Sequence, residues 1–168
     1  MNKDFIQSLN SEELIFTYGS VINEMKARGM IRSKNVVGDL GEFLAIDYYC
    51  KTKGLPKLQP APAGTKNIDA ISINGDRYSI KSTTGNVTGV FYGLNPPGSV
   101  ELDQQNFEFL IICLFDTDFS LKRINEISWG HFLKYKRWHS RMSAWNLTIT
   151  KDLLDNTKTI FNRSEMGS

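Results

Sequence analysis

The sequence has few of the features that mark secreted and membrane proteins. Its two cysteines, Cys50 and Cys113, stand far apart and offer neither a disulfide framework nor the paired spacing of a zinc site. The longest apolar run, residues 109–115, is far below the ~20 residues that a membrane-spanning helix needs. The first residues lack the apolar stretch of a secretory signal. These absences predict a cytoplasmic protein with no membrane partner.

Charge of either sign is not in excess, but it is unevenly placed. The chain has 20 Lys and Arg against 18 Asp and Glu, a formal net charge of +2. Residues 48–68 and 127–151 carry bases and no acid, whereas residues 82–121 carry acids and no base. Such segregation produces a basic face suited to a polyanion, unless folding interleaves the segments. The sequence leaves both outcomes open.

Length and composition predict one domain over residues 1–168. A chain of 168 residues with 40% apolar content fits a single domain with a real core. Neither an internal repeat nor a low-complexity linker divides it.

The hydrophobic periodicity predicts helices first and strands afterwards. Helical spacing covers residues 11–29 and 35–49, and Gly38 and Gly41 in the second helix predict close packing against a neighbouring element. Period-two patterns predict one hairpin from 68–73 and 77–82 and a second from 107–115 and 120–127. Shorter elements are expected at 129–136 (helix), 145–150 (strand) and 151–156 (helical turn). This order predicts an α/β or α+β domain.

The register of the first hairpin decides whether its polar residues can act together. If residues 74–76 form a three-residue connection, Asp69 lies opposite Lys81. Ile71 then lies opposite Ser79, on the same face. A two-residue connection would send Lys81 to the other face, where no site could form. We therefore favour the three-residue connection.

These strand residues are suited to metal-assisted hydrolysis of a phosphodiester. Asp69 would hold a hard cation such as Mg²⁺, helped by the backbone carbonyl of Ile80, and Lys81 would orient the attacking water or stabilise transition-state charge. One carboxylate is a poor magnesium site, so a second acid is expected. Glu42 is the best candidate, because small residues on its side of the helix allow a close approach to the sheet.

Asp69, followed after nine residues by Ser79-Ile80-Lys81 and preceded by a helix with Gly41-Glu42, resembles the PD-(D/E)XK nuclease superfamily. The resemblance covers about residues 35–127 and is strongest to small type II restriction endonucleases. It implies a restriction-endonuclease-like α/β core, with a mixed central sheet flanked by helices. It also implies cleavage of double-stranded DNA with Mg²⁺, for which Mn²⁺ can substitute, often by a homodimer of restriction or defence type.

Ser79 departs from this pattern, because the family has an acid at its position. A serine hydroxyl is a weak magnesium ligand, so the resemblance makes Glu42 essential and leaves Ser79 a weak or indirect role in the site. The alternative is a catalytically inactive nuclease-fold protein that binds DNA or a protein partner. An RNA-specific or structure-specific nuclease is a third interpretation, and a plain structural role for Asp69 and Lys81 is a fourth.

Two further segments carry candidate nucleic-acid contacts. Residues 131–141 mix bases with aromatics, as nucleic-acid surfaces do, and Lys136, Arg137 and Arg141 are the best candidates for phosphate contacts. The glycine-rich segment that follows Lys81 contains Thr84 and Asn86, which we expect in a loop facing DNA. Packing in the core and an ordinary surface loop are the alternatives for these two segments.

Overall fold

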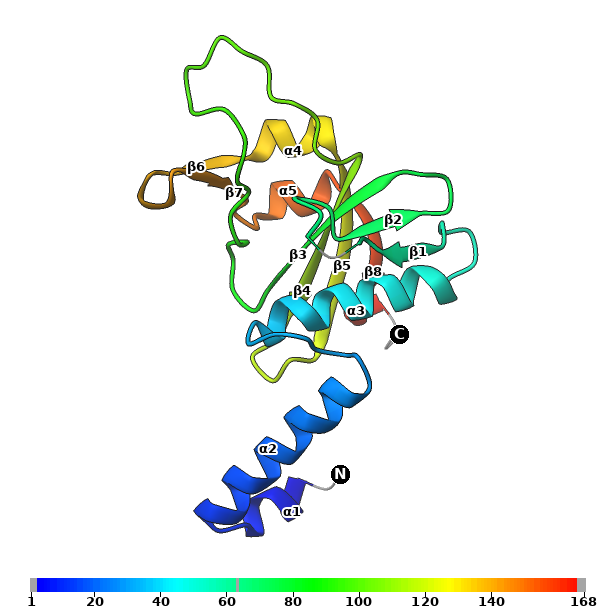
Figure 1. Ribbon diagram of the computed structural model, residues 1–168, viewed down its shortest axis with the longest axis vertical. Coiled ribbons are helices and arrows are strands. Elements are labelled where there is room, and N and C mark those ends of the chain that lie inside the picture. The colour runs from blue at the N-terminus through cyan, green and yellow to red at the C-terminus, as the bar shows by residue number, and fades with distance from the viewer. Residues whose placement is uncertain (1–2, 63, 166–168) are drawn as a thin grey trace.

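The computed structural model describes residues 3–62 and 64–165, which form an α/β structure around a mixed six-stranded sheet (Figure 1). The strand order is β1-β2-β3-β4-β5-β8. β3 and β4 are parallel, and the other neighbours are antiparallel. The strands are β1 (Leu58–Pro60), β2 (Ala70–Ser72), β3 (Arg77–Thr83), β4 (Phe109–Phe115), β5 (Leu121–Ser128) and β8 (Lys158–Asn162). The predicted α/β class with a mixed central sheet is confirmed.

Helices cover both faces of the sheet. α3 (Val36–Lys51) lies on one face, and α4 (Trp129–Tyr135) and α5 (Lys151–Asp155) lie on the other (Figure 1). A small hairpin of β6 (Arg137–His139) and β7 (Ala144–Asn146), joined by the 3₁₀ turn η1 (Ser140–Met142), stands beside α4 and α5. A second 3₁₀ turn, η2 (Arg163–Glu165), follows β8. Across the described ranges, no helix has the length and apolar character to cross a bilayer.

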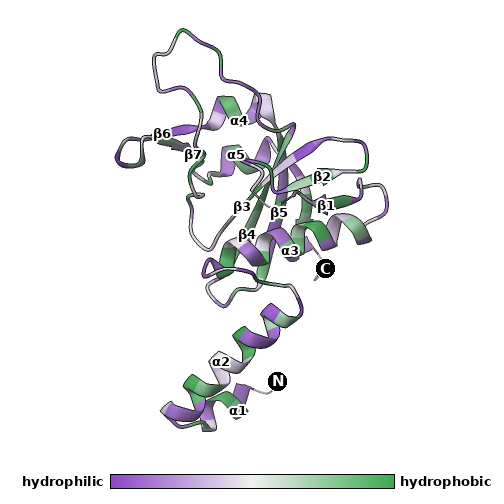
Figure 2. Cartoon of the chain, in the orientation of Figure 1, coloured by the Kyte–Doolittle hydropathy of each residue, from purple (hydrophilic) through white to green (hydrophobic). Residues whose placement is uncertain are grey.

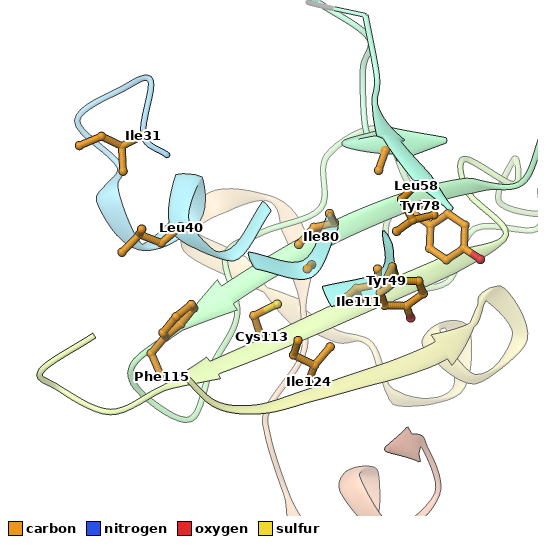
Figure 3. Packing of buried hydrophobic residues seen from close by; sticks show 12 residues of the cluster. Ile31, Leu40, Tyr49, Leu58, Tyr78, Ile80, Ile111, Cys113, Phe115 and Ile124 are labelled. Carbon is orange, nitrogen blue, oxygen red and sulfur yellow. The ribbon is translucent and has the colours of Figure 1, made fainter. Parts of the chain in front are cut away.

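β4 separates two hydrophobic cores, because successive strand side chains point to opposite faces. Ile111 and Cys113 pack under α3 with Tyr49 and Tyr78, whose ring centroids lie 6.0 Å apart (Figure 3). Leu110 and the other intervening residues of β4 pack beneath α4 and α5. This two-sided burial explains the continuous apolar run that the sequence shows at this strand.

The N-terminal helices, α1 (Lys3–Ser8) and α2 (Ser11–Ala27), form an arm that projects from the body (Figure 1). A capping box starts α2: the Asn10 side chain accepts the Glu13 N–H at 3.0 Å, and the Glu13 carboxylate accepts the Asn10 N–H at 2.9 Å. Neither helix has a buried residue. Apolar and polar residues alternate along the arm (Figure 2).

Most predicted elements are present, and three strands were not predicted. The helices expected at 11–29 and 35–49 are α2 and α3, and both expected hairpins form. β1, β6 and β8 were missed: β1 lies in a segment expected to be loop, and it is a strand because it pairs with β2. Short edge strands of this kind are defined by their partners, not by a local pattern.

The predicted register of the first hairpin is wrong by two residues. Ala70 pairs with Tyr78 and Ile71 with Arg77, so the connection consists of residues 73–75. Gly75, at a φ of 92°, provides the left-handed position with which a three-residue hairpin loop ends. Because the difference is an even number of residues, Ala70 and Tyr78 keep their predicted common face in the core.

Candidate active site

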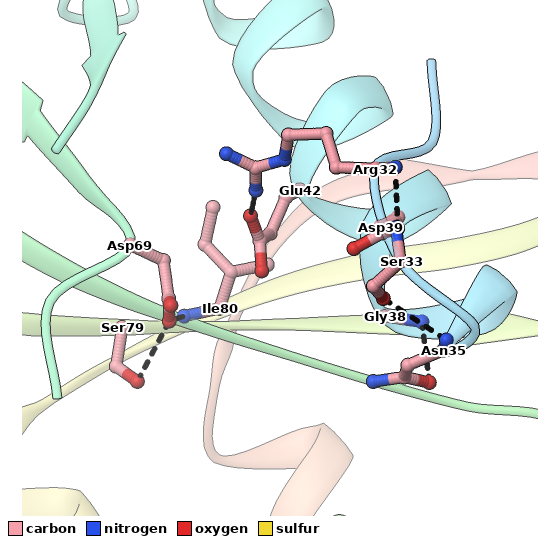
Figure 4. Close-up of polar contacts among 9 residues, drawn as sticks. All are labelled: Arg32, Ser33, Asn35, Gly38, Asp39, Glu42, Asp69, Ser79 and Ile80. Atoms are coloured by element: carbon pink, nitrogen blue, oxygen red, sulfur yellow. Dashed lines mark hydrogen bonds and ion pairs between the residues drawn. The ribbon is translucent and has the colours of Figure 1, made fainter. Parts of the chain in front are cut away.

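Asp69 lies directly before β2, and its backbone N–H donates to the Tyr78 carbonyl of β3. Its Oδ2 accepts the Ile80 N–H at 2.6 Å and the Ser79 hydroxyl at 3.2 Å (Figure 4). The N–H and C=O of one strand residue point to the same side, so the Ile80 carbonyl also faces the edge where Asp69 lies. Asp69, Ser79 and Ile80 are thus brought together, although Asp69 does not lie opposite Lys81 as predicted.

Glu42 reaches the same region from α3. Figure 4 shows its carboxylate between Arg32 and the strand segment at Ile80. Burial raises the pKa of Glu42, and the negative charge of Asp69 raises it further, while Arg32 opposes both effects. The negative charge of Asp69 therefore acts on Glu42 and disfavours its ionised form.

A glycine lets α3 approach β3 closely enough for this. A Cβ atom added at Gly41 would lie 1.6 Å from Ser82 Oγ and 2.7 Å from Ser82 Cβ. The Gly41 carbonyl also accepts a weak hydrogen bond from the Cys113 thiol at 3.7 Å. The close packing predicted from Gly41 is confirmed, and it fixes the position of Glu42, the next residue.

Arg32 and the buried Asp39 also lie in this region. Arg32 forms an ion pair with Glu42. The buried Asp39 accepts the backbone N–H groups of Arg32 at 2.6 Å and Ser33 at 2.5 Å, which fixes the loop that carries Arg32. Burial raises the pKa of Asp39, but these N–H donors outweigh it and the pKa is lowered overall. An arginine in a loop has no spacing that distinguishes it from a surface arginine.

A hollow of about 360 Å³ opens beside Glu42, lined by Met30, Arg32, Asp39, Phe43, Ile46 and Pro60 among others. Its walls are mostly apolar, with the Arg32 and Glu42 pair on one side. The Glu42 carboxylate is therefore reachable from solvent, and its side chain is 24% exposed.

Lys81 contacts an aromatic ring on the other side of β3 from α3. The half-buried Lys81 has its ammonium over the ring of Phe91, 5.1 Å from the centroid, and Phe91 belongs to the core opposite α3. Within the parts of the chain that the structure describes, Lys81 forms no ion pair with Asp69 or Glu42. The four-carbon stem of a lysine leaves the ammonium free to take other positions.

Oxygen atoms from Glu42, Asp69 and the Ile80 carbonyl are the groups that can hold a metal. Residues 3–62 and 64–165 contain no group of three or more His, Cys, Asp or Glu placed to bind one. Mg²⁺ is commonly held by one or two carboxylates, with water and substrate phosphate completing its coordination. The donors fit a hard cation of that kind, and they do not fit a site built entirely from protein ligands.

The candidate phosphate contacts differ in how exposed they are. Arg137 and Arg141 are exposed on β6 and on the turn that follows it. Lys136 instead forms an ion pair with Asp103, with both side chains largely buried, and lies 4.2 Å from the centroid of the Trp145 ring. Lys136 thus holds a loop of the acidic segment, so folding does interleave acidic and basic segments here.

The loop after β3 is exposed at Thr84 and Asn86, and backbone hydrogen bonds hold the chain in place from Asn86 onward. The Asn86 carbonyl accepts the Ile149 N–H at 2.7 Å, and the following residues bridge to the segment around β7. Its exposed residues therefore have a fixed position beside the sheet.

No protein-family model matches this chain, and no curated protein matches it.

Proposed function

We propose that the protein is a Mg²⁺-dependent DNA endonuclease of restriction or defence type, built on a restriction-endonuclease-like core. The observation that carries the proposal is the position of Glu42 beside Asp69 at the edge of β3, where the negative charge of Asp69 raises the pKa of Glu42 (Figure 4). Glu42 then supplies, from α3, the acid that Ser79 does not.

Each residue of the site has a distinct part in this proposal. Glu42, Asp69 and the Ile80 carbonyl would hold the cation, which when bound activates water and offsets charge on the phosphate. The Ile80 N–H and the Ser79 hydroxyl both hold Asp69 Oδ2, so the other oxygen of Asp69 is oriented for a ligand. Lys81 would leave the Phe91 ring to orient the attacking water.

Binding of duplex DNA needs positive charge outside the site. Arg137 and Arg141 are exposed and suited to phosphate contacts, and Thr84 and Asn86 offer hydrogen-bonding groups from the loop after β3. Lys136 would contribute only if it exchanged Asp103 for a phosphate. A chain of this length has little room for a separate reading domain, so recognition of a duplex favours a two-fold homodimer.

A second candidate is a catalytically inactive nuclease-fold protein that binds DNA or a protein partner. The Arg32–Glu42 ion pair favours it, because a permanent pair would neutralise the acid on which metal binding depends. Ser79 favours it as well, since its hydroxyl donates a hydrogen bond to Asp69 and adds no negative charge for a metal. In this case the protein binds DNA or the partner without cleaving DNA.

Cleavage of a panel of plasmid and phage DNA, with Mg²⁺ or Mn²⁺, separates the two. The unaltered protein should give discrete fragments that disappear with chelator, in Glu42→Ala and in Lys81→Ala. Asp47→Ala, an acid on the same helix paired with Lys51, and Lys53→Ala, an exposed lysine, are the matched controls and should cleave normally. Cleavage that survives Glu42→Ala would show that the second acid lies elsewhere. DNA binding without cleavage would support the inactive protein.

A further inference from the structure

A hollow of about 580 Å³ lies where β3 and β4 end, beside the turn that leads into β5 (Figure 1). β3 and β4 are the parallel pair of the sheet, and ligands of α/β proteins commonly bind outside the carboxyl ends of parallel strands. The lining comes from the loop after β3, the end of β4, the start of β5, α5 and the end of β8. Glu42 and Asp69 do not line it, so the hollow is separate from the candidate active site.

A bulge in β5 brings two adjacent cations to this hollow. Arg123 pairs with Leu114 of β4, but the next residue of β4 pairs with Leu121. Lys122 is therefore an extra residue, without a partner on β4. Leu121 and Ile124 both pack in the core beneath α3, although residues three apart on a regular strand point to opposite faces. The bulge thus displaces Lys122 from that core face, and Lys122 lines the hollow together with Arg123.

The positive charge of these two side chains is not balanced by an acid. In residues 3–62 and 64–165, neither Lys122 nor Arg123 forms an ion pair. Arg123 is partly buried, donates to the Thr159 hydroxyl at 2.9 Å, and has no partner for its buried Nε among the described residues. Arginine is seldom removed from water without an anionic partner. The two cations are therefore suited to hold an anionic ligand.

One acid also lines the hollow, but it has a partner of its own. Asp116 forms an ion pair with Arg163, which also donates to the Ser120 hydroxyl at 2.7 Å. Asp118, in the same turn, is exposed and accepts a hydrogen bond from Ser120 at 2.6 Å. The charge of Asp116 is thus balanced by Arg163, and the charges of the two bulge cations remain.

The rest of the lining offers neutral hydrogen-bonding groups and apolar surface. The Thr84 hydroxyl and the Asn86 amide are exposed, and side chains of these types commonly bind phosphate oxygens. Ile149 and Leu154 are partly buried apolar residues of the same lining. Small-molecule sites combine apolar walls with a few polar groups in this way. The hollow can therefore hold both a charged group and an organic group attached to it.

We propose that this hollow binds a phosphate monoester, with Lys122 and Arg123 holding the phosphate. A monoester carries a charge of about −1.5 to −2 at pH 7, which matches the two unbalanced cations, whereas each phosphodiester of a nucleic-acid backbone carries one negative charge. A volume of about 580 Å³ is that of a site for a small organic ligand, so the esterified group enters as well. A free nucleotide and the phosphorylated end of a nucleic-acid strand are two sources of this chemistry. The site does not rest on the proposed nuclease activity.

NMR titration of the isotope-labelled full chain, without divalent cations, tests the site while the proposed cleavage cannot occur. Thymidine 5′-monophosphate should shift the backbone amide signals of Thr84, Asn86 and Lys122, whereas thymidine should not. Lys122→Gln, a change at an exposed side chain, should raise the Kd several-fold. Lys53→Gln removes an exposed lysine that does not line the hollow and should leave the Kd unchanged. Absence of these shifts, or an unchanged Kd in Lys122→Gln, would overturn the proposal.

Two further comparisons test the monoester and identify its source. Methyl phosphate should bind more tightly than dimethyl phosphate, and equal affinity would contradict the monoester assignment. A short DNA hairpin with a 5′-phosphate is compared with the same hairpin without it. A gain from the phosphate that exceeds the affinity for thymidine 5′-monophosphate, and that is lost in Lys122→Gln, would support a strand end as the source. No gain from the phosphate, with thymidine 5′-monophosphate still bound, would support a free phosphate monoester.

Discussion

Arg32 forms an ion pair with Glu42, the carboxylate that also lies in the field of Asp69. The arginine thereby supplies positive charge where the proposed cation would be held. Its side chain is 63% exposed, against 24% for Glu42, so the guanidinium can move into solvent at little cost. If the proposed function holds, Arg32 and a divalent cation would therefore compete for Glu42.

Arg32→Ala should raise the affinity for Mn²⁺ or Mg²⁺ several-fold, because the competing charge is removed. Isothermal titration calorimetry measures this without any requirement for activity. Arg28→Ala, which removes an arginine paired with Glu24 on α2, is the matched control and should leave metal affinity unchanged. Weaker or unchanged metal binding in Arg32→Ala would mean that Arg32 does not compete at this position.

Glu42→Gln should stabilise the protein at neutral pH and lose that advantage in acid. Burial, followed by the charge of Asp69, raises the pKa of Glu42 in the folded state. A raised carboxyl pKa means that stability is fully present below the unfolded value and falls as pH rises through the folded value. Glutamine does not ionise, so the difference from the unaltered protein should grow from below pH 4.5 towards neutral.

Urea denaturation midpoints at acid and neutral pH check this behaviour of Glu42. Glu101→Gln, in an exposed loop, controls for the change in net charge. If the urea midpoint of Glu42→Gln at neutral pH is lower than that of the unaltered protein, the ion pair with Arg32 stabilises the folded state by more than burial and the charge of Asp69 destabilise it.

Asp39→Ala should cost about 1–3 kcal/mol of unfolding free energy, because two backbone donors in a partly buried loop would lose their acceptor. Asp39→Asn keeps one carbonyl oxygen and should cost less. The pKa of Asp39 is lowered in the folded state, so its contribution is present above the ordinary value of 3.8 and lost as pH falls through the folded value. Urea unfolding over this acid range is the measurement, and an equal loss at all pH values would contradict it.

The sequence predicted the elements well because their signals are local. Close packing was predicted from two glycines of α3, and it is confirmed at Gly41, whose neighbour is Ser82 of β3. It is wrong at Gly38, which meets only the side chain of Asn35, the N-cap of the same helix. The register of the first hairpin was missed because Asn74-Gly75 is compatible with more than one connection, and the choice depends on the left-handed backbone at Gly75. Arg32 was missed because its partner is ten residues away on a helix, and only folding brings the two together.

The position of Lys81 shows a different limit. Alternation along a strand assigns a side chain to a face, but the ammonium of a lysine lies several bonds from the backbone. The Phe91 ring, which attracts that ammonium, comes from a loop with no regular pattern. Strand periodicity therefore could not predict the contact.

Gly41→Ala should destabilise the protein by about 1–3 kcal/mol, because a methyl group must be inserted where helix and strand already touch. Rotation of the Ser82 hydroxyl cannot remove the clash, since the added carbon also lies 2.7 Å from Ser82 Cβ. Ser82→Ala should therefore rescue poorly, whereas Ser82→Gly removes both contacts and should recover much of the loss. Urea unfolding of the single and double variants gives the coupling between the two positions. The same displacement of α3 would move Glu42 away from Asp69, so Gly41→Ala should also weaken metal binding. A Gly41→Ala variant with full stability and normal metal affinity would show that the close approach of α3 does not determine the geometry of the site.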